Sequence, residues 1–305
     1  MKYKLFAIAI LCFSYATINA QRNLITLENE TNETDGVITI SAFNQGSGIY
    51  TLKINFNIAG FTSTYGNPYF TTVNQGKSQV CKLTPDKNAG FRSVGYSYTY
   101  YAGTSFRKAP NNYMHYLLPI TPGRTTLVTP VSQLSSLLEQ KSETFFYAQS
   151  FSYSLGDTIC ATRAGVIYNI NDELKQGEGK TTVYADDRNK IYIQHKDGTV
   201  AHYTILAPMQ NLVQNGESVI PGQPLAVFNK KADKYNLLFS VFYLDESKIR
   251  QDNSKEVYVA LPTYYYLNPN APSTTLTEGQ KYEATKSLEI IAEELSKKEK
   301  KKLGL

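Results

Sequence analysis

Short stretches in which apolar and polar residues alternate constrain the fold of this chain more than any other feature. Alternation with a period of two places successive side chains on opposite faces of a strand, so that one face is buried while the other meets solvent. Three such stretches lie at residues 37–41, 50–56 and 94–100, and Gly, Asn and Pro clusters separate them. This pattern predicts a mainly β chain that opens with an Ig-like β-sandwich over residues 21–111.

The tyrosines of the third stretch share one face of the expected strand. Tyr96, Tyr98 and Tyr100 are spaced two residues apart, and side chains at that spacing point the same way. We expect this row to face the core of the sandwich. The alternative is a platform on which a sugar ring stacks.

The first 20 residues have the order of a cleavable signal peptide. Lys2 and Lys4 precede an apolar run at residues 5–13, and the small-residue exit Asn19-Ala20 follows it. The run is too short to remain in a membrane as a spanning helix. We therefore expect an exported protein, periplasmic or extracellular, with no transmembrane span.

Ordered motifs dominate the second half of the chain. They read G-D-T-I-C-A-T-R-A-G-V-I at residues 156–167, I-Y-I-Q-H-K-D-G-T at 191–199, Y-T-I-L at 203–206, N-G-E-S-V-I-P-G-Q-P-L at 215–225 and N-L-L-F-S-V at 236–241. Together they resemble the core of the lysostaphin-type (LytM-like) zinc endopeptidases, a family that cuts peptidoglycan peptide bridges. The resemblance implies a lysostaphin-like antiparallel β domain, the duplicated hybrid motif fold, over residues 112–267.

The same resemblance implies where zinc ligands and catalytic histidines would lie, and this chain carries other residues there. Ser150 stands at the aspartate ligand, Ile205 at the histidine of Y-A-H-L, and Asn236 and Leu238 at the two histidines of H-L-H. The upstream histidine ligand has no counterpart, and its place would fall at Phe146. A catalytic zinc needs three protein ligands with imidazole, thiolate or carboxylate donors. We therefore expect a degenerate domain with no catalytic residue, no cofactor and no bound zinc, and a vestigial groove lined by these four residues: Ser150, Ile205, Asn236 and Leu238.

Three histidines remain in the chain, and none is expected to rebuild a metal site. His202 and Ile205 have opposite parity on one expected strand, so His202 should point away from the groove. His195 borders a K-D-G turn, and His115 lies at the start of the second domain. Solvation or ordinary hydrogen bonding accounts for each of them.

A linker and a basic helical tail are expected over residues 268–305. The sequence N-P-N-A-P at 268–272 is typical of a linker, and residues 278–303 are helical by composition. Apolar residues recur there at helical spacing, at Leu288, Ile291, Ala292 and Leu295. The lysine run at 297–302 either attracts an anionic membrane or wall polymer, or is a solvated helix end.

The distribution of charge argues against nucleic acid as a partner. The formal net charge is +5, but the positive excess lies in the signal peptide and in the terminal lysine run, which leaves the body near neutrality. Nucleic-acid recognition needs a basic face, often with interleaved aromatic residues, and the body has none evident. Cys81 and Cys160 lie in different expected domains, where they either pair in an oxidising compartment or stay as separate buried thiols.

These features favour a secreted pseudopeptidase that binds or regulates during peptidoglycan remodelling in the cell envelope. Its expected partner is an envelope protein such as a wall hydrolase, or a peptidoglycan peptide. One alternative is an active peptidoglycan metalloendopeptidase with non-standard ligands. Another is a structural or surface-attachment module, because a fold alone does not fix a function.

Overall fold

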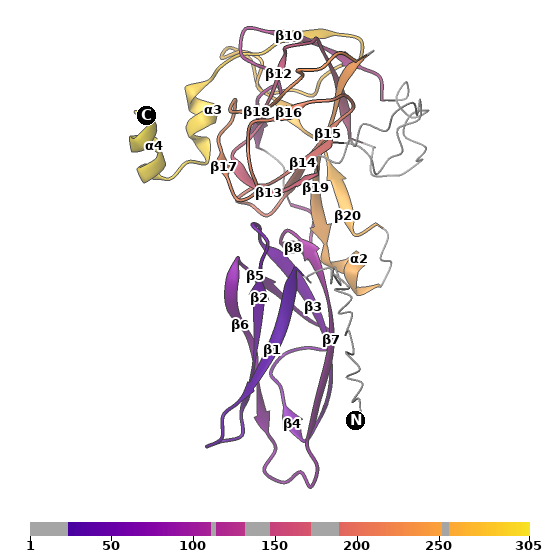
Figure 1. Cartoon of the computed structure of the whole chain (residues 1–305), viewed down its shortest axis with the longest axis vertical. Coiled ribbons are helices and arrows are strands. Elements are labelled where there is room, and N and C mark those ends of the chain that lie inside the picture. The colour runs from indigo at the N-terminus through magenta and orange to yellow at the C-terminus, as the bar shows by residue number, and fades with distance from the viewer. Residues whose placement is uncertain (1–23, 111–113, 132–146, 172–188, 233, 252–255) are drawn as a thin grey trace, which may run out of the picture.

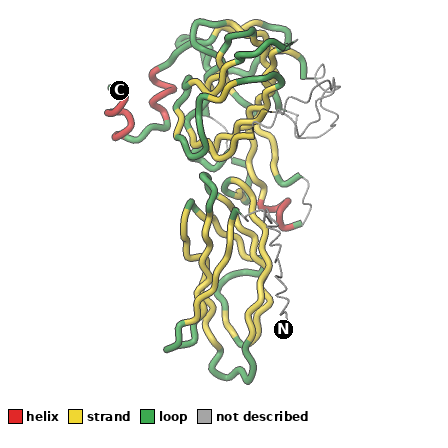
Figure 2. The backbone as a smooth tube through the Cα atoms, viewed as in Figure 1, coloured by secondary structure: helices red, strands yellow, loops and turns green. Residues whose placement is uncertain are grey.

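The chain forms a mainly β structure of two domains with a short helical segment at its C-terminus (Figures 1 and 2). The computed structural model describes residues 24–110, 114–131, 147–171, 189–232, 234–251 and 256–305. An elongated N-terminal domain lies at one end of the long axis, and a rounder second domain lies at the other. The predicted fold class, a mainly β chain with a helical tail, is confirmed.

The N-terminal domain is a β-sandwich. One sheet has the order β1-β2-β6-β4, built from β1 (Ile25–Thr31), β2 (Ile38–Asn44), β6 (Gly76–Pro85) and β4 (Phe61–Thr62). The other has the order β5-β3-β7, built from β5 (Tyr69–Val73), β3 (Tyr50–Ala59) and β7 (Ser93–Ala102). The buried side chains of both sheets, Ile40, Leu52, Ile54 and Leu83 among them, form one apolar cluster. The three predicted strands correspond to β2, β3 and β7.

The tyrosine row of β7 faces the core for most of its length. Tyr96 and Tyr98 pack against the sandwich cluster. Tyr98 also donates its hydroxyl to the backbone oxygen of Ile25 at 2.9 Å. Tyr100 is 38% exposed and meets Tyr50 edge to face. The core-facing interpretation therefore holds for the first two tyrosines, and the third lies at the margin.

The second domain is organised around one large sheet. Its path runs β17-β13-β14-β15-β19-β11-β10-β22, and β20 and β8 also pair with β19. These strands are β8 (Ser105–Phe106), β10 (Thr125–Thr129), β11 (Gln149–Tyr153), β13 (Gly165–Asn171), β14 (Asn189–Gln194), β15 (Val200–Ile205), β17 (Ser218–Val219), β19 (Tyr235–Asp245), β20 (Tyr258–Leu261) and β22 (Lys281–Glu283). A small sheet, β12-β18-β16, is formed by β12 (Thr158–Cys160), β18 (Pro224–Val227) and β16 (Gln210–Asn211). A parallel pair joins β21 (Tyr264–Tyr265) to β9 (His115–Tyr116).

Strand β19 reaches past its own domain and joins the two domains. Leu244 and Asp245 at its end pair in parallel with β8, which directly follows the last strand of the sandwich. The side-chain amide of Gln194 acts like a further strand residue, because it accepts from the backbone nitrogen of Ile49 at 2.7 Å and donates to its oxygen at 3.1 Å. Lys53 donates to the carbonyl of Ile249 in α2 (Glu246–Arg250) at 3.1 Å. The domains are therefore held together by several contacts rather than by a single tether.

The predicted boundary at residue 267 is wrong. The chain turns back after the N-P-N-A-P segment, and β22 pairs with β10 at the edge of the large sheet. Ala284 lies in the core of the second domain. Residues 281–284 thus complete this domain, because β10 needs a partner along its free edge and β22 supplies it.

The helical tail is shorter than predicted and packs on the second domain. Its helices are α3 (Leu288–Glu293) and α4 (Lys297–Leu303). Ser287 caps α3 by accepting from the backbone nitrogen of Ile290, which fixes where the helix begins. Ile290 and Ile291 pack with Leu117, whereas Leu288 is 56% exposed. The apolar stripe therefore begins two residues later than the spacing predicted.

Two further expectations are settled by burial and position. Cys81 and Cys160 are both free and buried, one in each domain, so they are separate thiols. Burial raises the pKa of each thiol to about 11, which makes both poor nucleophiles. No helix in the described ranges is long and apolar enough to cross a membrane. Phe146 lies outside the described residues.

Candidate functional site

The expected groove falls on the face of the large sheet that points away from the main core. Along β19, odd-numbered residues such as Leu237 and Phe239 join the main apolar cluster, so the even-numbered ones face the other way. Ser150 of β11 pairs with Leu238, and Ser152 pairs with Asn236. Partners in register share a face. The structure therefore brings Ser150, Asn236 and Leu238 together on this even face of the sheet.

Ile205 does not belong to this face, which corrects the expected groove. It pairs with Leu237 and is fully buried in the main apolar cluster. Thr204, one residue earlier, pairs with Leu238 and takes the place that Ile205 was expected to fill. The error has a simple cause, because a shift of one residue along a strand moves a side chain to the opposite face.

The same shift reverses the expectation for His202. This residue has the parity of Thr204, so it lies on the even face and pairs with Ser240 of β19. Its ring packs between Tyr192 and Phe242, with centroid distances of 4.7 and 4.6 Å. Burial among these rings, and then the charge of Lys190, lowers the pKa of His202 to about 3. The imidazole is therefore neutral at physiological pH and acts as one ring of an aromatic row.

Short neutral side chains on the even face satisfy one another. The Thr129 hydroxyl donates to the Ser150 hydroxyl at 2.7 Å, and the Ser152 hydroxyl donates to the Asn236 side-chain oxygen at 3.3 Å. Ser150, Asn236 and Leu238 are 0, 8 and 3% exposed. Leu238 packs with Val131, Ala148 and Leu206. This part of the face is thus a packed, hydrogen-bonded surface.

These residues do not fit a zinc ion. Structural and catalytic zinc sites use imidazole, thiolate or carboxylate donors, and Ser150, Asn236 and Leu238 offer a hydroxyl, an amide and a hydrocarbon. The hydroxyl and amide are already engaged in the hydrogen bonds described above. In the part of the chain that the structure describes, no group of three His, Cys, Asp or Glu residues is placed to hold a metal ion.

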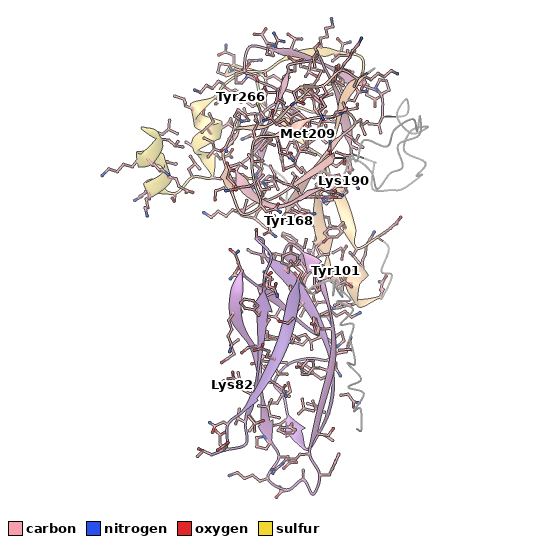
Figure 3. All side chains as sticks on the ribbon, in the orientation of Figure 1. Lys82, Tyr101, Tyr168, Lys190, Met209 and Tyr266 are labelled. Carbon is pink, nitrogen blue, oxygen red and sulfur yellow. The ribbon has the colours of Figure 1, made fainter. Side chains whose placement is uncertain are left out.

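A row of aromatic side chains continues the even face toward the N-terminal domain. Tyr168, Tyr192, His202 and Phe242 are in successive ring contact, starting with a centroid distance of 5.6 Å between Tyr168 and Tyr192. Tyr168 lies against Gly48 of the N-terminal domain, where an added Cβ would come within 2.8 Å of it. Figure 3 marks Tyr168 near the junction of the domains. Tyr192, His202, Thr204 and Leu206 of the even face are all partly exposed, and these four residues form the accessible row of the face.

A small pocket opens at the other end of the face. It has a volume of about 180 Å3 and is lined by residues that include Thr129, Tyr147, Gln149, Thr263 and Glu278. The pocket lies where the ends of β11 and β20 meet beside β19. Gln149 of β11 pairs with Phe239, and Leu261 of β20 pairs with Val241, so the two strands end on either side of Ser240. Ala148, another lining residue, also packs on Leu238.

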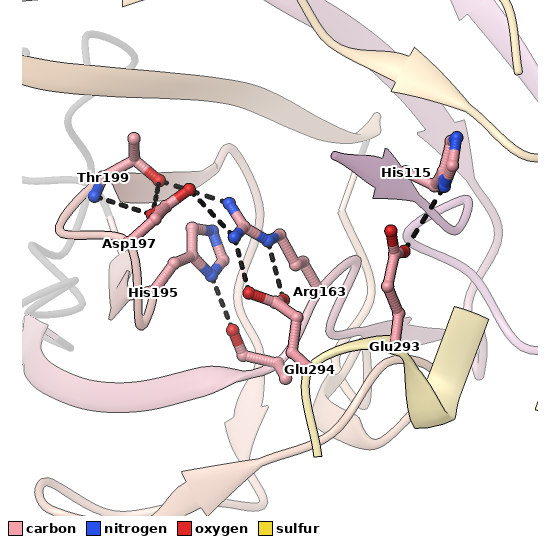
Figure 4. A network of polar contacts seen from close by, with 8 residues as sticks. His115, Arg163, His195, Asp197, Thr199, Glu293 and Glu294 are labelled. Carbon is pink, nitrogen blue, oxygen red and sulfur yellow. Dashed lines mark hydrogen bonds and ion pairs between the residues drawn. The ribbon is translucent and has the colours of Figure 1, made fainter. Parts of the chain in front are cut away.

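A second polar site lies beneath the C-terminal helices and is charged (Figure 4). Arg163 is 1% exposed and donates to both carboxylate oxygens of Glu294, at 2.7 and 2.5 Å. A second carboxylate, that of Asp197, lies 2.9 Å from the same guanidinium. Burial alone would lower the pKa of Arg163, but the hydrogen bonds with Glu294 raise it above its ordinary value. No sequence pattern predicted this cluster, because its members come from three separate segments.

His195 belongs to this buried cluster, so hydrogen bonding and not solvation accounts for it. Its Nδ1–H donates to the carbonyl of Ala164 at 2.7 Å, and the residue is 2% exposed. Its Nε2 has no hydrogen-bond partner among the residues that the structure describes. Burial, and then the charge of Arg163, lowers the pKa of His195 to about 3. The turn folds inward because the Asp197 carboxylate forms an ion pair with Arg163.

His115, the third histidine of the chain, is half-exposed, and its Nδ1 lies 3.3 Å from the Glu293 carboxylate.

Comparisons with known proteins give only a distant likeness. The sequence matches no protein-family model and no curated protein. Among solved structures, a peptidase M23 from Pseudomonas aeruginosa matches with a TM-score of 0.28 and 11% identity, over 64% of this chain and 88% of that chain. A zinc-containing peptidase from Vibrio cholerae matches with a TM-score of 0.26 and 13% identity, over 70% of this chain and 81% of that chain. Similarity at this level carries no argument about the activity of this chain.

Proposed function

We propose that this protein is an exported, non-catalytic lysostaphin-like protein that binds a partner on the even face of its large sheet. The partner is a wall hydrolase or a peptidoglycan peptide, and the role is regulation of envelope remodelling. One observation carries the proposal: Ser150, Asn236 and Leu238 come together, at two zinc-ligand positions and one catalytic-histidine position implied by the sequence resemblance, and their polar groups bond to neighbouring side chains. A face of this composition can pack and hydrogen-bond, but it offers no donor set for a catalytic zinc.

The accessible row beside these residues supplies the means of binding. Tyr192, His202, Thr204 and Leu206 are partly exposed and combine aromatic, hydroxyl and aliphatic groups. Polypeptide segments bind to surfaces of this kind because aromatic and aliphatic groups supply buried area and a few polar groups fix orientation. The neutral imidazole of His202 can be covered without the cost of burying a charge.

Hydrolysis separates this proposal from an active enzyme. Purified peptidoglycan sacculi incubated with the protein and zinc should release no more peptide than sacculi incubated with buffer. Zinc-dependent release of peptide above that background, abolished by a chelator, would support the alternative hypothesis of an active metalloendopeptidase with non-standard ligands.

Binding is tested with a substitution on the accessible row. Thr204→Arg places a long charged side chain on the even face, and Thr39→Arg is the matched control on a half-buried strand position of the sandwich. We expect Thr204→Arg to weaken capture of a purified wall hydrolase, or sedimentation with sacculi, by about 10-fold or more, which corresponds to the loss of roughly 1.4 kcal/mol. Thr39→Arg should leave both unchanged. Equal behaviour of the two variants would rule out the even face as the binding surface.

A further inference from the structure

The terminal helix α4 is well defined although it has only seven residues. An isolated helix of this length is unstable in water, so its ends must contribute. The Ser296 side chain accepts from the backbone nitrogen of Glu299, and the Glu299 carboxylate accepts from the backbone nitrogen of Ser296 at 2.7 Å. Gly304 closes the other end in the left-handed conformation, with a φ of 72°. This capping box and C-terminal glycine fix the direction of the side chains on α4.

The helix is also held at a fixed place on the second domain. Glu294, which immediately follows α3, makes the two hydrogen bonds with the buried Arg163. Ile290 and Ile291 of α3 pack with Leu117. Only Leu295 and Ser296 then separate this anchor from α4. Figure 1 shows α4 projecting from the body of the domain at the C-terminus.

The lysines of α4 gather on one side of the helix. At 100° per residue, Lys297, Lys298, Lys300, Lys301 and Lys302 cover one broad side, and Glu299 and Leu303 lie on the other. Lys297, Lys298, Lys301 and Lys302 are exposed and Lys300 is partly exposed, so solvent reaches the lysine side of the helix along its length. No residue of α4 is buried, and none of its lysines forms an ion pair with any described residue.

We propose that this lysine face docks the protein on an anionic lipid surface. Five unpaired ammonium groups on one rigid face form a patch of charge that complements acidic headgroups. Lysine suits this task because it acts as a compact point charge and needs no planar partner. Leu303 flanks Lys300 at the margin of the lysine side, and Leu303 and Leu305 are 46 and 41% exposed, so both can enter the interfacial region of a bilayer.

A dissolved polyanion is the less favoured partner. Residues 288–305 contain no aromatic side chain, so they provide nothing for nucleic-acid bases to stack on. A soluble polyphosphate would use the lysines but would gain nothing from the exposed leucines. The docking surface is separate from the even face and does not depend on the function proposed above.

Vesicle sedimentation tests the proposal with the chain from residue 21, because the apolar run before it would bind lipid by itself. We expect binding to vesicles of phosphatidylglycerol and phosphatidylcholine, and none to phosphatidylcholine alone. Each lysine near an anionic surface should contribute about 5-fold. Changing Lys297, Lys298, Lys300, Lys301 and Lys302 to Gln should therefore lower binding by about 100-fold or more. The folded body should be unaffected, because α4 buries no residue.

The matched control removes the same charge elsewhere. Lys82, Lys87, Lys230, Lys231 and Lys234 are exposed and lie outside the tail, and changing them to Gln should alter vesicle binding less than about 3-fold. Leu303→Ser with Leu305→Ser should weaken binding to vesicles but not to soluble polyphosphate. Equal losses in the two lysine variants, no binding to anionic vesicles, or no effect of the leucine changes would overturn the proposal. Thr204→Arg should bind vesicles normally, which separates a failure here from a failure of the even face.

Discussion

The two polar sites of the second domain use opposite chemistry. The even face, at Ser150 and Asn236, consists of neutral groups that hydrogen-bond to adjacent short side chains. The cluster beneath the tail places a buried arginine between two carboxylates. A neutral hydrogen-bonded surface loses little when a partner covers it, whereas a buried charge depends on every one of its partners. The comparison indicates that this domain places buried charge where the C-terminal segment is held, and neutral groups at Ser150 and Asn236.

Truncation of the C-terminal segment tests whether this segment is part of the folded domain, and it has the largest expected effect. Deleting residues 281–305 removes β22 and α3, which exposes the edge of β10 and uncovers Leu117. We expect the protein to lose its cooperative unfolding transition in urea or to aggregate. Deleting only residues 297–305 should change the free energy of unfolding by less than about 0.5 kcal/mol, because α4 buries nothing. A cooperative, unshifted transition in the longer deletion would mean that the tail is an accessory after all.

The buried arginine should be the most sensitive single position. Arg163→Ala removes the partner of the largely buried Glu294 and of Asp197, whose side chain is 37% exposed, and we expect a loss of about 3 kcal/mol in urea unfolding, most of it from Glu294. Lys77→Ala is the control, because Lys77 and Glu30 form an exposed pair at 3.4 Å that should contribute less than about 1 kcal/mol. Similar losses for both variants would show that the buried cluster stabilises the fold no more than an exposed ion pair does.

Acid should weaken the charged cluster through His195. The folded pKa of His195 is about 3, and an unfolded histidine titrates near 6.5. Between these values the unfolded state binds the additional proton, so stability is complete above about pH 6.5 and falls as the pH is lowered. The expected loss from this residue is roughly 2 kcal/mol between pH 6.5 and 5.

A His195→Gln variant isolates this contribution, since the carboxylates titrate in both proteins. We expect the variant to show a flatter dependence of unfolding free energy on pH over that interval. Parallel curves for the variant and the wild type would show that His195 is protonated or exposed in the folded state.

Zinc probes the neutral site and should have the smallest effect. A metal present at 100 times its dissociation constant would stabilise the fold by about 2.7 kcal/mol. We expect no shift of the thermal midpoint on adding zinc, and no stoichiometric zinc by elemental analysis, because Ser150, Asn236 and Leu238 are unsuitable donors. One zinc per chain would show that the even face is a metal site and would make the two sites alike.

The sequence by itself determined the β architecture and the composition of the site. Alternation at residues 37–41, 50–56 and 94–100 predicted β2, β3 and β7, because period two is a local property of a strand. The residues Ser150, Asn236 and Leu238, at the positions where the resemblance implies zinc ligands or a catalytic histidine, are likewise readable without coordinates.

Only the tertiary structure decided which side chains meet. The register of β15 against β19 placed Thr204 and His202 on the even face and Ile205 in the core, and register depends on pairing between distant segments. The return of β22 to β10, and the meeting of Arg163 with Asp197 and Glu294, likewise join residues far apart in the chain. Local patterns specify elements, but contacts between distant elements depend on how the whole chain buries its apolar surface and pairs its charges.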